Sequence, residues 1–347
     1  MPMSNNLPLV SVLVPTYNAA PYLQELCESI QTQTYRNLEV LILNDGSSDN
    51  TLAVLEPYRK DPRVRIFGWS PNRGVNASTS ALLGLMRGEY WCNPGADDVL
   101  HPVFVAQRLE LLQSHMEAAL VHGPSELIDE SGHLAKGDFQ FLKLPSQTEG
   151  PRALAMLLQH NVIGTTSVLV RSDITRLVLP FFLCNWKYAQ DWYLWLLHAA
   201  TGYDLLWDVQ PLHKYRVHER SLSFDPAKAA MRRAEIRLVP LCALSAAARF
   251  SPLAAELWSK WRKTLYRAWL LRAVKLRCEG LLQEEWLRLG GRAYYGRNKR
   301  CVSFFWELSK HGLGVPLTGL KERRALQTQS FRVSGIAQIN DPVFAAP

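Results

Sequence analysis

The sequence has 347 residues, of which 48% are hydrophobic and 20% charged, a composition that excludes wholesale disorder and suits one or two domains. No apolar run reaches the roughly 18 residues of a membrane-spanning helix, and the N-terminus lacks a secretory pattern, so we expect a cytoplasmic protein. Residues 1–225 contain 17 Lys and Arg against 23 Asp and Glu, whereas residues 226–347 contain 22 against 8. The basic C-terminal part is therefore expected to face something anionic.

Short apolar runs alternate with helical periods over the first hundred residues. The predicted strands span 9–15, 38–43, 64–67 and 88–92, and the predicted helices begin near Pro21, Asp49 and Val75. Short apolar runs stopped by polar loops are typical of strands buried on both faces. Their alternation with helices predicts an α/β fold with a doubly wound, mostly parallel sheet.

A polar loop follows each predicted strand, and the loop after the fourth strand holds the adjacent acids Asp97 and Asp98. Ligands of open α/β sheets bind beyond the carboxyl ends of the strands, so this acidic pair could hold a hard cation against a diphosphate. Alternatively, Asp98 caps the helix predicted over 104–115. Both interpretations stay open from this stretch alone.

The pattern weakens between residues 116 and 152, a segment expected to shape an acceptor pocket together with the residues up to 190. A loop and a strand follow over 160–171. Asp191 then begins an aromatic, apolar helix, and the segment 215–223 closes the first domain, predicted to span 1–225. The six cysteines are scattered without metal-ligand spacing, which is typical of reduced thiols in a cytoplasmic protein.

Seven motifs in this order resemble the inverting glycosyltransferases of family 2, which have a GT-A fold. They are Val14-Pro15-Thr16-Tyr17-Asn18, Ser29 to Tyr35 leading into Glu39-Val40, Asp45-Gly46-Ser47-Ser48-Asp49, Asn72-Arg73-Gly74, Gly88-Glu89-Tyr90 with Ala96-Asp97-Asp98, Gln190-Asp191 and Tyr215-Arg216-Val217-His218. Each motif alone is weak, but their joint order and spacing are specific. The resemblance covers residues 8–225.

The resemblance implies a nucleotide-sugar site made by the first loops. Its expected residues are Pro15, Thr16, Tyr17, Asn18, Asp45, Gly46, Asn72, Arg73, Gly74, Ala96 and Asp97. Asp45 would accept the imide N–H of a uracil or thymine, and Asn72 and Arg73 would contact the base or the diphosphate. Two alternatives remain: Tyr17 and Asn18 could serve only as turn residues, and Arg73 could be a solvated loop charge.

The resemblance also implies a divalent metal, Mn²⁺ or Mg²⁺, that bridges the two phosphates. Asp97 matches the second acid of the family's D-x-D motif, and one well-placed carboxylate can suffice beside phosphate oxygens and water. Gly95 departs from the family because it stands where the first acid is expected. Asp98 could supply the missing charge through a water, and His218 would lie near the metal or the diphosphate, although a structural role for this histidine stays open.

Asp191 matches the family's catalytic base, with Gln190 where Glu is more usual. Inversion requires a base opposite the leaving nucleotide, which takes the proton of the acceptor hydroxyl as it attacks. The competing interpretation is a simple N-cap of the helix.

The C-terminal region, 226–347, is predicted to be a mainly helical extension. Residues 251–280 predict a long helix with tryptophans on one face and basic residues on the other. This helix either packs on the catalytic domain or meets the anionic inner face of the plasma membrane. Further helices are expected over 281–315, and the last 25 residues are expected to be loosely held. No nucleic-acid recognition motif accompanies the charge.

The resemblance as a whole implies a metal-dependent, inverting glycosyltransferase. It would move a sugar from a UDP-sugar, with a dTDP- or GDP-sugar as the alternative donor, to a hydroxyl of a glycan or lipid-linked acceptor in surface polysaccharide assembly. The expected classes of donor and acceptor follow from the resemblance to the family. The alternatives are a non-catalytic homologue that binds a nucleotide sugar, suggested by Gly95, and a sugar nucleotidyltransferase, which would need a glycine-rich N-terminal loop that 14–18 lacks.

Overall fold

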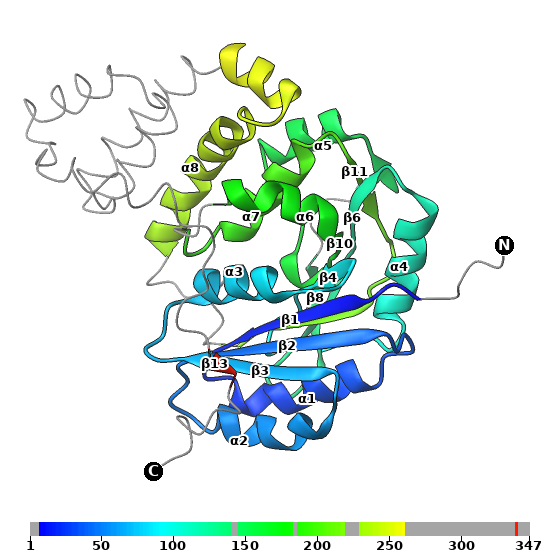
Figure 1. Ribbon diagram of the computed structural model, residues 1–347, viewed down its shortest axis with the longest axis vertical. Coiled ribbons are helices and arrows are strands. Elements are labelled where there is room, and N and C mark those ends of the chain that lie inside the picture. The colour runs from blue at the N-terminus through cyan, green and yellow to red at the C-terminus, as the bar shows by residue number, and fades with distance from the viewer. Residues whose placement is uncertain (1–6, 140–144, 183–185, 219–228, 261–336, 339–347) are drawn as a thin grey trace, which may run out of the picture. The chain divides into compact units, whose positions relative to one another are not determined.

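The computed structural model describes residues 7–139, 145–182, 186–218, 229–260 and 337–338 (Figure 1). The chain forms two compact units, one of residues 1–224 with 333–347 and one of residues 225–332.

A large sheet organises the first unit, with nine strands among the residues that the structure describes. In spatial order they are β13 (Ala337–Gln338), β3 (Val64–Trp69), β2 (Leu38–Asp45), β1 (Val10–Thr16), β4 (Tyr90–Cys92), β10 (Leu169–Arg171), β6 (Ala118–His122), β11 (Asp204–Trp207) and β9 (Gln147–Thr148). Parallel pairing joins β1 to β2 and β4, β2 to β3, and β6 to β11. Strands β10, β9 and β13 are antiparallel to their neighbours. The predicted mostly parallel α/β sheet is confirmed.

The strand order reverses direction between β1 and β4. From β1 the chain steps outward to β2 and β3, and it then returns past β1 to form β4. The connecting helices are α1 (Ala20–Gln31), α2 (Thr51–Leu55) and α3 (Val75–Leu85). The crossovers place α1 and α2 on one face of the sheet and α3 on the other, as Figure 1 shows. The carboxyl ends of β1 and β4 therefore flank the point where doubly wound sheets bind ligands.

Continuous apolar runs explain the central strands. Val12 and Val14 of β1 and Val40 and Ile42 of β2 are at most 3% exposed, and the two strands pair along seven residues. Each fully buried side chain of this size contributes about 1.5–3 kcal/mol. Leu23, Leu26 and Ile30 on one face of α1 are buried in the same core, so the period predicted after Pro21 is the buried face of a helix.

The segment 116–152 holds more regular structure than its weak pattern indicates. It supplies β6 and β9 to the large sheet and adds β7 (Ser125–Ile128) and β8 (Leu134–Phe139) to a second sheet of order β5-β12-β7-β8. The other two strands are β5 (Val99–Leu100) and β12 (His213–Arg216). This second sheet joins the acidic loop after β4 to the end of the first unit.

The remaining helices support the strands or form the second unit. They are α4 (Phe104–Ser114), α5 (Gly150–Leu157), α6 (Ser172–Val178), α7 (Gln190–Ala199) and, in the second unit, α8 (Ala229–Ala247), with short 3-10 helices at Glu56–Lys60, Thr165–Ser167 and Leu179–Phe181. Residue Val103 is the N-cap of α4, so the interpretation of Asp98 as a helix cap is wrong.

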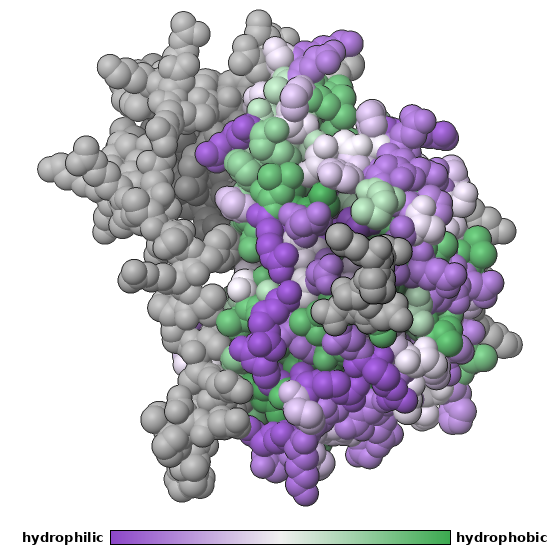
Figure 2. Space-filling view, turned by 45° about the vertical axis from the view of Figure 1, so that its right-hand side comes forward, coloured by the Kyte–Doolittle hydropathy of each residue, from purple (hydrophilic) through white to green (hydrophobic). Residues whose placement is uncertain are grey.

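Only the start of the long helix predicted over 251–280 can be checked. Residues 252–260 are helical, and the rest of that prediction lies outside the described residues, as do the helices of 281–315 and most of the last 25 residues. In the part of the chain that is described, no helix has the length and apolarity to cross a membrane. On the face shown in Figure 2, apolar residues lie in several separate areas among hydrophilic ones.

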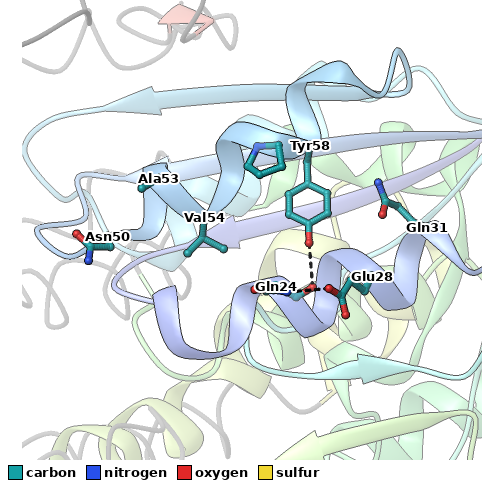
Figure 3. Close-up of a pocket in the computed structure, with 8 residues that line it drawn as sticks. Gln24, Glu28, Gln31, Asn50, Ala53, Val54 and Tyr58 are labelled. Carbon is teal, nitrogen blue, oxygen red and sulfur yellow. Dashed lines mark hydrogen bonds between the residues drawn. The ribbon is translucent and has the colours of Figure 1, made fainter.

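An open surface groove lies between α1 and the segment 50–58 (Figure 3). Gln24 Nε2 donates to Glu28 Oε1 over 2.8 Å, and the Tyr58 hydroxyl donates to the Gln24 carbonyl over 3.4 Å. None of the site residues predicted from the sequence lines this groove. The candidate site therefore lies elsewhere, at the carboxyl ends of the strands.

Candidate active site

Hydrogen bonds join the loops that follow β1 and β2. The backbone N–H of Asn18 donates to Ser47 Oγ over 2.9 Å, and Asn18 Oδ1 accepts the N–H of Ser48 over 2.8 Å. Asn18 has a φ of 49°, a left-handed conformation that asparagine tolerates. Tyr17 is 51% exposed beside it, and the buried hydroxyl of Thr16 has no partner among the described residues. An aromatic ring and an unsatisfied hydroxyl thus stand at the end of β1.

Asp45 fixes the loop that carries Asn72 and Arg73. Its carboxylate is 2% exposed and accepts the backbone N–H groups of Arg73, over 2.7 Å, and Gly74, over 2.8 Å. It also accepts a hydrogen bond from the indole N–H of Trp69. A carboxylate can accept about four bonds, so at most about one remains for the base imide that the resemblance assigns to Asp45.

Two further contacts shape this loop. The Arg73 guanidinium lies 4.6 Å from the ring centre of Trp69, which orients this exposed cation. Gly46 has a φ of 69°, and a Cβ atom there would lie 2.9 Å from the backbone nitrogen of Asn72. The close approach of the two loops therefore requires glycine at position 46.

Asp97 and His218 meet although 121 residues separate them. His218 Nε2 lies 2.8 Å from Asp97 Oδ2, and the Tyr22 ring at the start of α1 lies 4.9 Å from the imidazole. The Asp97 side chain is 32% exposed. Carboxylate and imidazole suit Mn²⁺, and the described residues contain no group of three or more ligating side chains. The residues present fit a metal that takes its other ligands from phosphate oxygens and water.

Asp98 points into the protein instead. Its side chain is 1% exposed, Oδ2 lies 3.0 Å from His213 Nε2, and Oδ1 accepts the backbone N–H of Arg216 over 2.9 Å. His213 Nδ1 in turn lies 2.8 Å from Ser125 Oγ. Because both carboxylate oxygens bind β12, we assign Asp98 to the support of the 95–98 turn, a correction of its predicted metal role. Sequence reasoning missed His213 and Ser125.

Both acids converge on Gly95. A Cβ atom at this position would lie 2.6 Å from Asp98 Oδ2 and 2.7 Å from Asp97 Oδ1, distances that real Cβ atoms do not adopt. The glycine therefore leaves room for the two carboxylates that follow it. Ala96 lies between the acids and Gly95 in a partly buried position.

Arg216 fastens the turn to neighbouring elements. Its side chain is 1% exposed, Nε donates to the carbonyl of Asp97 over 2.7 Å, and Nη1 donates to the carbonyl of Asp129 over 3.0 Å. Nη2 binds Glu25, and the guanidinium lies 5.0 Å from the ring centre of Tyr22. The motif Tyr215-Arg216-Val217-His218 is the sequence signal that marks this residue.

Asp191 lies in the first turn of α7, whose N-cap is Ala189, so Asp191 is not the N-cap. Its Oδ2 accepts hydrogen bonds from Thr165 Oγ1, over 2.9 Å, and from Asn161 Nδ2, over 3.2 Å. Burial raises the pKa of Asp191 above its ordinary value, and these two donors and the backbone N–H of Trp192 oppose that rise. The adjacent Gln190 Oε1 is buried without a partner among the described residues. A carboxylate with a raised pKa is suited to accept a proton.

Comparisons with known proteins identify relatives of this chain. The sequence profile described as "Glycosyl transferase family 2" matches residues 11–175. An uncharacterized glycosyltransferase of Haemophilus influenzae is 32% identical over 225 residues, which cover 63% of this chain and 68% of the relative. The chain belongs to glycosyltransferase family 2. A hyaluronan synthase of Pasteurella multocida is 34% identical over 157 residues, but these cover only 16% of that longer protein.

Solved glycosyltransferase structures share the fold. Staphylococcus aureus TarS in complex with UDP superposes with a TM-score of 0.57 at 17% identity, covering 85% of this chain and 82% of TarS. A mannosyltransferase of Pyrobaculum calidifontis in complex with GDP-Man and Mn²⁺ gives a TM-score of 0.51, covering 85% and 89%. This family 2 glycosyltransferase therefore has the GT-A fold that the sequence predicted.

Proposed function

We propose that this family 2 glycosyltransferase transfers a sugar, with inversion and with a divalent metal, from a UDP-sugar to a hydroxyl of a glycan or lipid-linked acceptor. The observation that carries the proposal is the meeting of Asp97 and His218 at the reversal of the strand order. There a nucleotide diphosphate would lie against the ends of β1 and β4. The synthases among the relatives support a role in surface polysaccharide assembly.

Three groups of residues would divide the work. Tyr17 and the loop 70–74 would hold the nucleotide, with Arg73 as a cation near the phosphates. A metal on Asp97 and His218 would neutralise the negative charge that develops on the leaving diphosphate. Asp191 would accept the proton of the acceptor hydroxyl as its oxygen attacks the anomeric carbon. UDP in TarS supports uracil, whereas GDP-Man in the mannosyltransferase makes guanine the alternative to test.

Nucleotide release tests the proposal. The full chain is incubated with Mn²⁺, candidate acceptors and a panel of UDP-, dTDP- and GDP-sugars, and the freed nucleoside diphosphate is measured. We expect UDP release that EDTA abolishes. Asp97→Asn should weaken Mn²⁺-dependent UDP binding, whereas Asp191→Asn should leave UDP binding intact. Absence of both binding and release with every donor would reject the proposal.

Gly95 suggests one alternative function, that of a homologue that binds a nucleotide sugar without turnover. The chain lacks the first acid of the metal motif, and its place is filled by the carboxylates of Asp97 and Asp98. This alternative predicts UDP binding that Mn²⁺ and EDTA leave unchanged. Metal-dependent binding together with release would exclude it.

A further inference from the structure

We propose that Thr165 and Asn161 are positioning residues that hold the Oδ2 atom of Asp191, so that Oδ1 is the atom that receives the acceptor's proton. The inference rests on the proposed function and concerns two residues outside the motifs of the sequence analysis. Both belong to the segment 161–167, which precedes β10.

The two donors select one carboxylate oxygen. Thr165 Oγ1 and Asn161 Nδ2 both lie within 3.2 Å of Oδ2. Among the described residues no side chain donates a hydrogen bond to Oδ1. An ionised carboxylate only accepts hydrogen bonds, so both neighbours must donate. Both side-chain donors therefore hold the same oxygen, in addition to the backbone N–H of Trp192, which also donates to this carboxylate. Oδ1, which has no side-chain donor, is left for a substrate hydroxyl.

The orientation of the Asn161 amide is fixed as well. Asn161 Oδ1 accepts the backbone N–H of Ile163 over 3.3 Å, while Nδ2 donates to Asp191. A flipped amide would point its oxygen at the carboxylate and its NH₂ group at an N–H donor, and both contacts would be repulsive. Asn161 is thus a donor to Asp191 in the only orientation that satisfies both partners.

Hydrogen bonds and buried side chains hold the segment 161–167, which contains these two donors. Ser167 Oγ donates to the carbonyl of Gly123 over 2.9 Å, and the buried guanidinium of Arg108 donates to the carbonyl of Ser167. Val162 and Ile163 are at most 1% exposed. Because the backbone is held on both sides of Thr165, its hydroxyl is presented to Asp191 with little freedom.

In the transfer step the acceptor O–H bond breaks while its oxygen bonds to the anomeric carbon. The bond from that carbon to the diphosphate oxygen breaks, and its electron pair leaves with the nucleotide. The proton goes to Oδ1 of Asp191. A base must lie within hydrogen-bond reach of the hydroxyl at the moment of attack, so a carboxylate that swings away lowers the rate of transfer rather than the affinity for the donor.

Substitutions at position 165 test this with a matched control. Thr165→Val keeps the shape and removes the hydroxyl, so we expect kcat to fall by roughly tenfold while the KM for the UDP-sugar stays unchanged. Thr165→Ser restores the donor and should recover most of kcat. Asn161→Ala should act in the same direction as Thr165→Val, and the double variant should lose more than either.

Thr175→Val is the control for a buried threonine that loses its hydrogen bonds. The Thr175 hydroxyl accepts from the Trp91 indole over 2.7 Å and lies 3.0 Å from His198 Nε2, away from Asp191. This variant should lose thermal stability and keep kcat. Wild-type kcat in Thr165→Val, an equal loss in Thr165→Ser, or an equal loss in Thr175→Val would each overturn the inference. A wild-type chain that transfers no sugar would instead reject the proposed function, and the inference with it.

Discussion

Three aspartates of the site differ in environment more than in sequence context. Asp97 is partly exposed beside His218, Asp98 is buried beneath the turn, and Asp191 lies among neutral donors at the start of α7. The three carboxylates therefore suit metal binding, support of the turn and proton transfer, respectively. The adjacent pair Asp97-Asp98 looks like one acidic unit in the sequence, although its members bind different partners, His218 for Asp97 and His213 with the backbone N–H of Arg216 for Asp98.

The pH dependence of transfer should report Asp191. Because burial raises its pKa, the base is lost to protonation at a higher pH than an ordinary aspartate, whose pKa is about 3.9. We expect kcat/KM at saturating Mn²⁺ to fall as the pH drops through this raised pKa. Thr165→Val, which removes a donor that lowers the pKa, should move the acidic limb to higher pH. A limb that stays in place would contradict this assignment of the donor.

Asp191→Asn should separate stability from activity. When a carboxyl group has a raised pKa in the folded state, its ionisation lowers the free energy of unfolding of the protein. This loss is present at neutral pH and vanishes below the pKa that the group has in the unfolded chain. The amide carries no such cost. We expect a higher melting temperature than wild type at pH 7, a difference that shrinks toward pH 4, and transfer lower by roughly 10²–10⁴-fold. A lower melting temperature at pH 7 would argue that the carboxylate is structural.

Restoring the missing acid at Gly95 should harm the site. Any side chain there meets the oxygens of Asp97 and Asp98, and forced repacking of this kind costs about 1–3 kcal/mol. We expect Gly95→Ala and Gly95→Asp both to weaken Mn²⁺-dependent UDP binding by about tenfold, with binding in EDTA as the internal control. Tighter metal-dependent binding by Gly95→Asp at unchanged stability would show that the turn can accommodate the acid.

At the scale of elements, β12 connects the separate pieces of the site. It places His213 under Asp98, Arg216 on the carbonyl of Asp97, and His218, two residues beyond its end, beside the Asp97 carboxylate. Three side chains from one short segment thus fix the turn after β4. The geometry of the Asp97–His218 pair therefore depends on a strand that is distant in the sequence.

The Arg216–Glu25 pair should be asymmetric in stability. Arg216 is 1% exposed and donates to backbone carbonyls, whereas Glu25 is 51% exposed and can be solvated without its partner. We expect Arg216→Gln to lower the free energy of unfolding by about 3 kcal/mol and Glu25→Gln by less than about 1 kcal/mol. Urea unfolding of both variants measures the difference. Equal losses would mean that the ion pair itself, and not the carbonyl contacts, stabilises β12.

A strand can be predicted from the sequence when its own residues form a recognisable pattern. Strands β1 to β4 are confirmed because strands buried on both faces are continuous apolar runs. Strand β6 was not predicted, since it is short and its partners β10 and β11 lie some 50 to 90 residues away. Strand β7 was missed although β8 follows it directly, because both are short and polar; its other partner, β12, is distant in the sequence. Thr165 and Asn161 were not identified as partners of Asp191 for a similar reason. A polar loop indicates only a turn in the sequence, and its contact with Asp191 exists only in the folded chain.

At the scale of the whole molecule, the first 225 residues and the rest of the sequence differ in charge. Residues 1–225 have 23 acidic against 17 basic side chains, and residues 226–347 have 8 against 22. The acidic part contains the proposed site. Within the second unit the structure describes α8 and the helical residues 252–260, and most of the basic side chains lie beyond them. The charge distribution itself is a property of the sequence and predicts how the full chain meets charged surfaces.

The full chain should bind vesicles that contain anionic lipid. Each basic group near such a surface contributes about 1 kcal/mol, and salt screens the attraction within a Debye length of about 8 Å at physiological ionic strength. We expect co-sedimentation with vesicles rich in phosphatidylglycerol at low salt, release as salt is raised, and no binding to phosphatidylcholine vesicles. A variant with Lys260 and the basic residues of 261–300 changed to Gln should lose the binding and keep UDP release from a soluble acceptor. Binding that ignores salt and lipid charge would indicate apolar insertion, and no binding to either vesicle would reject a membrane role for the basic region.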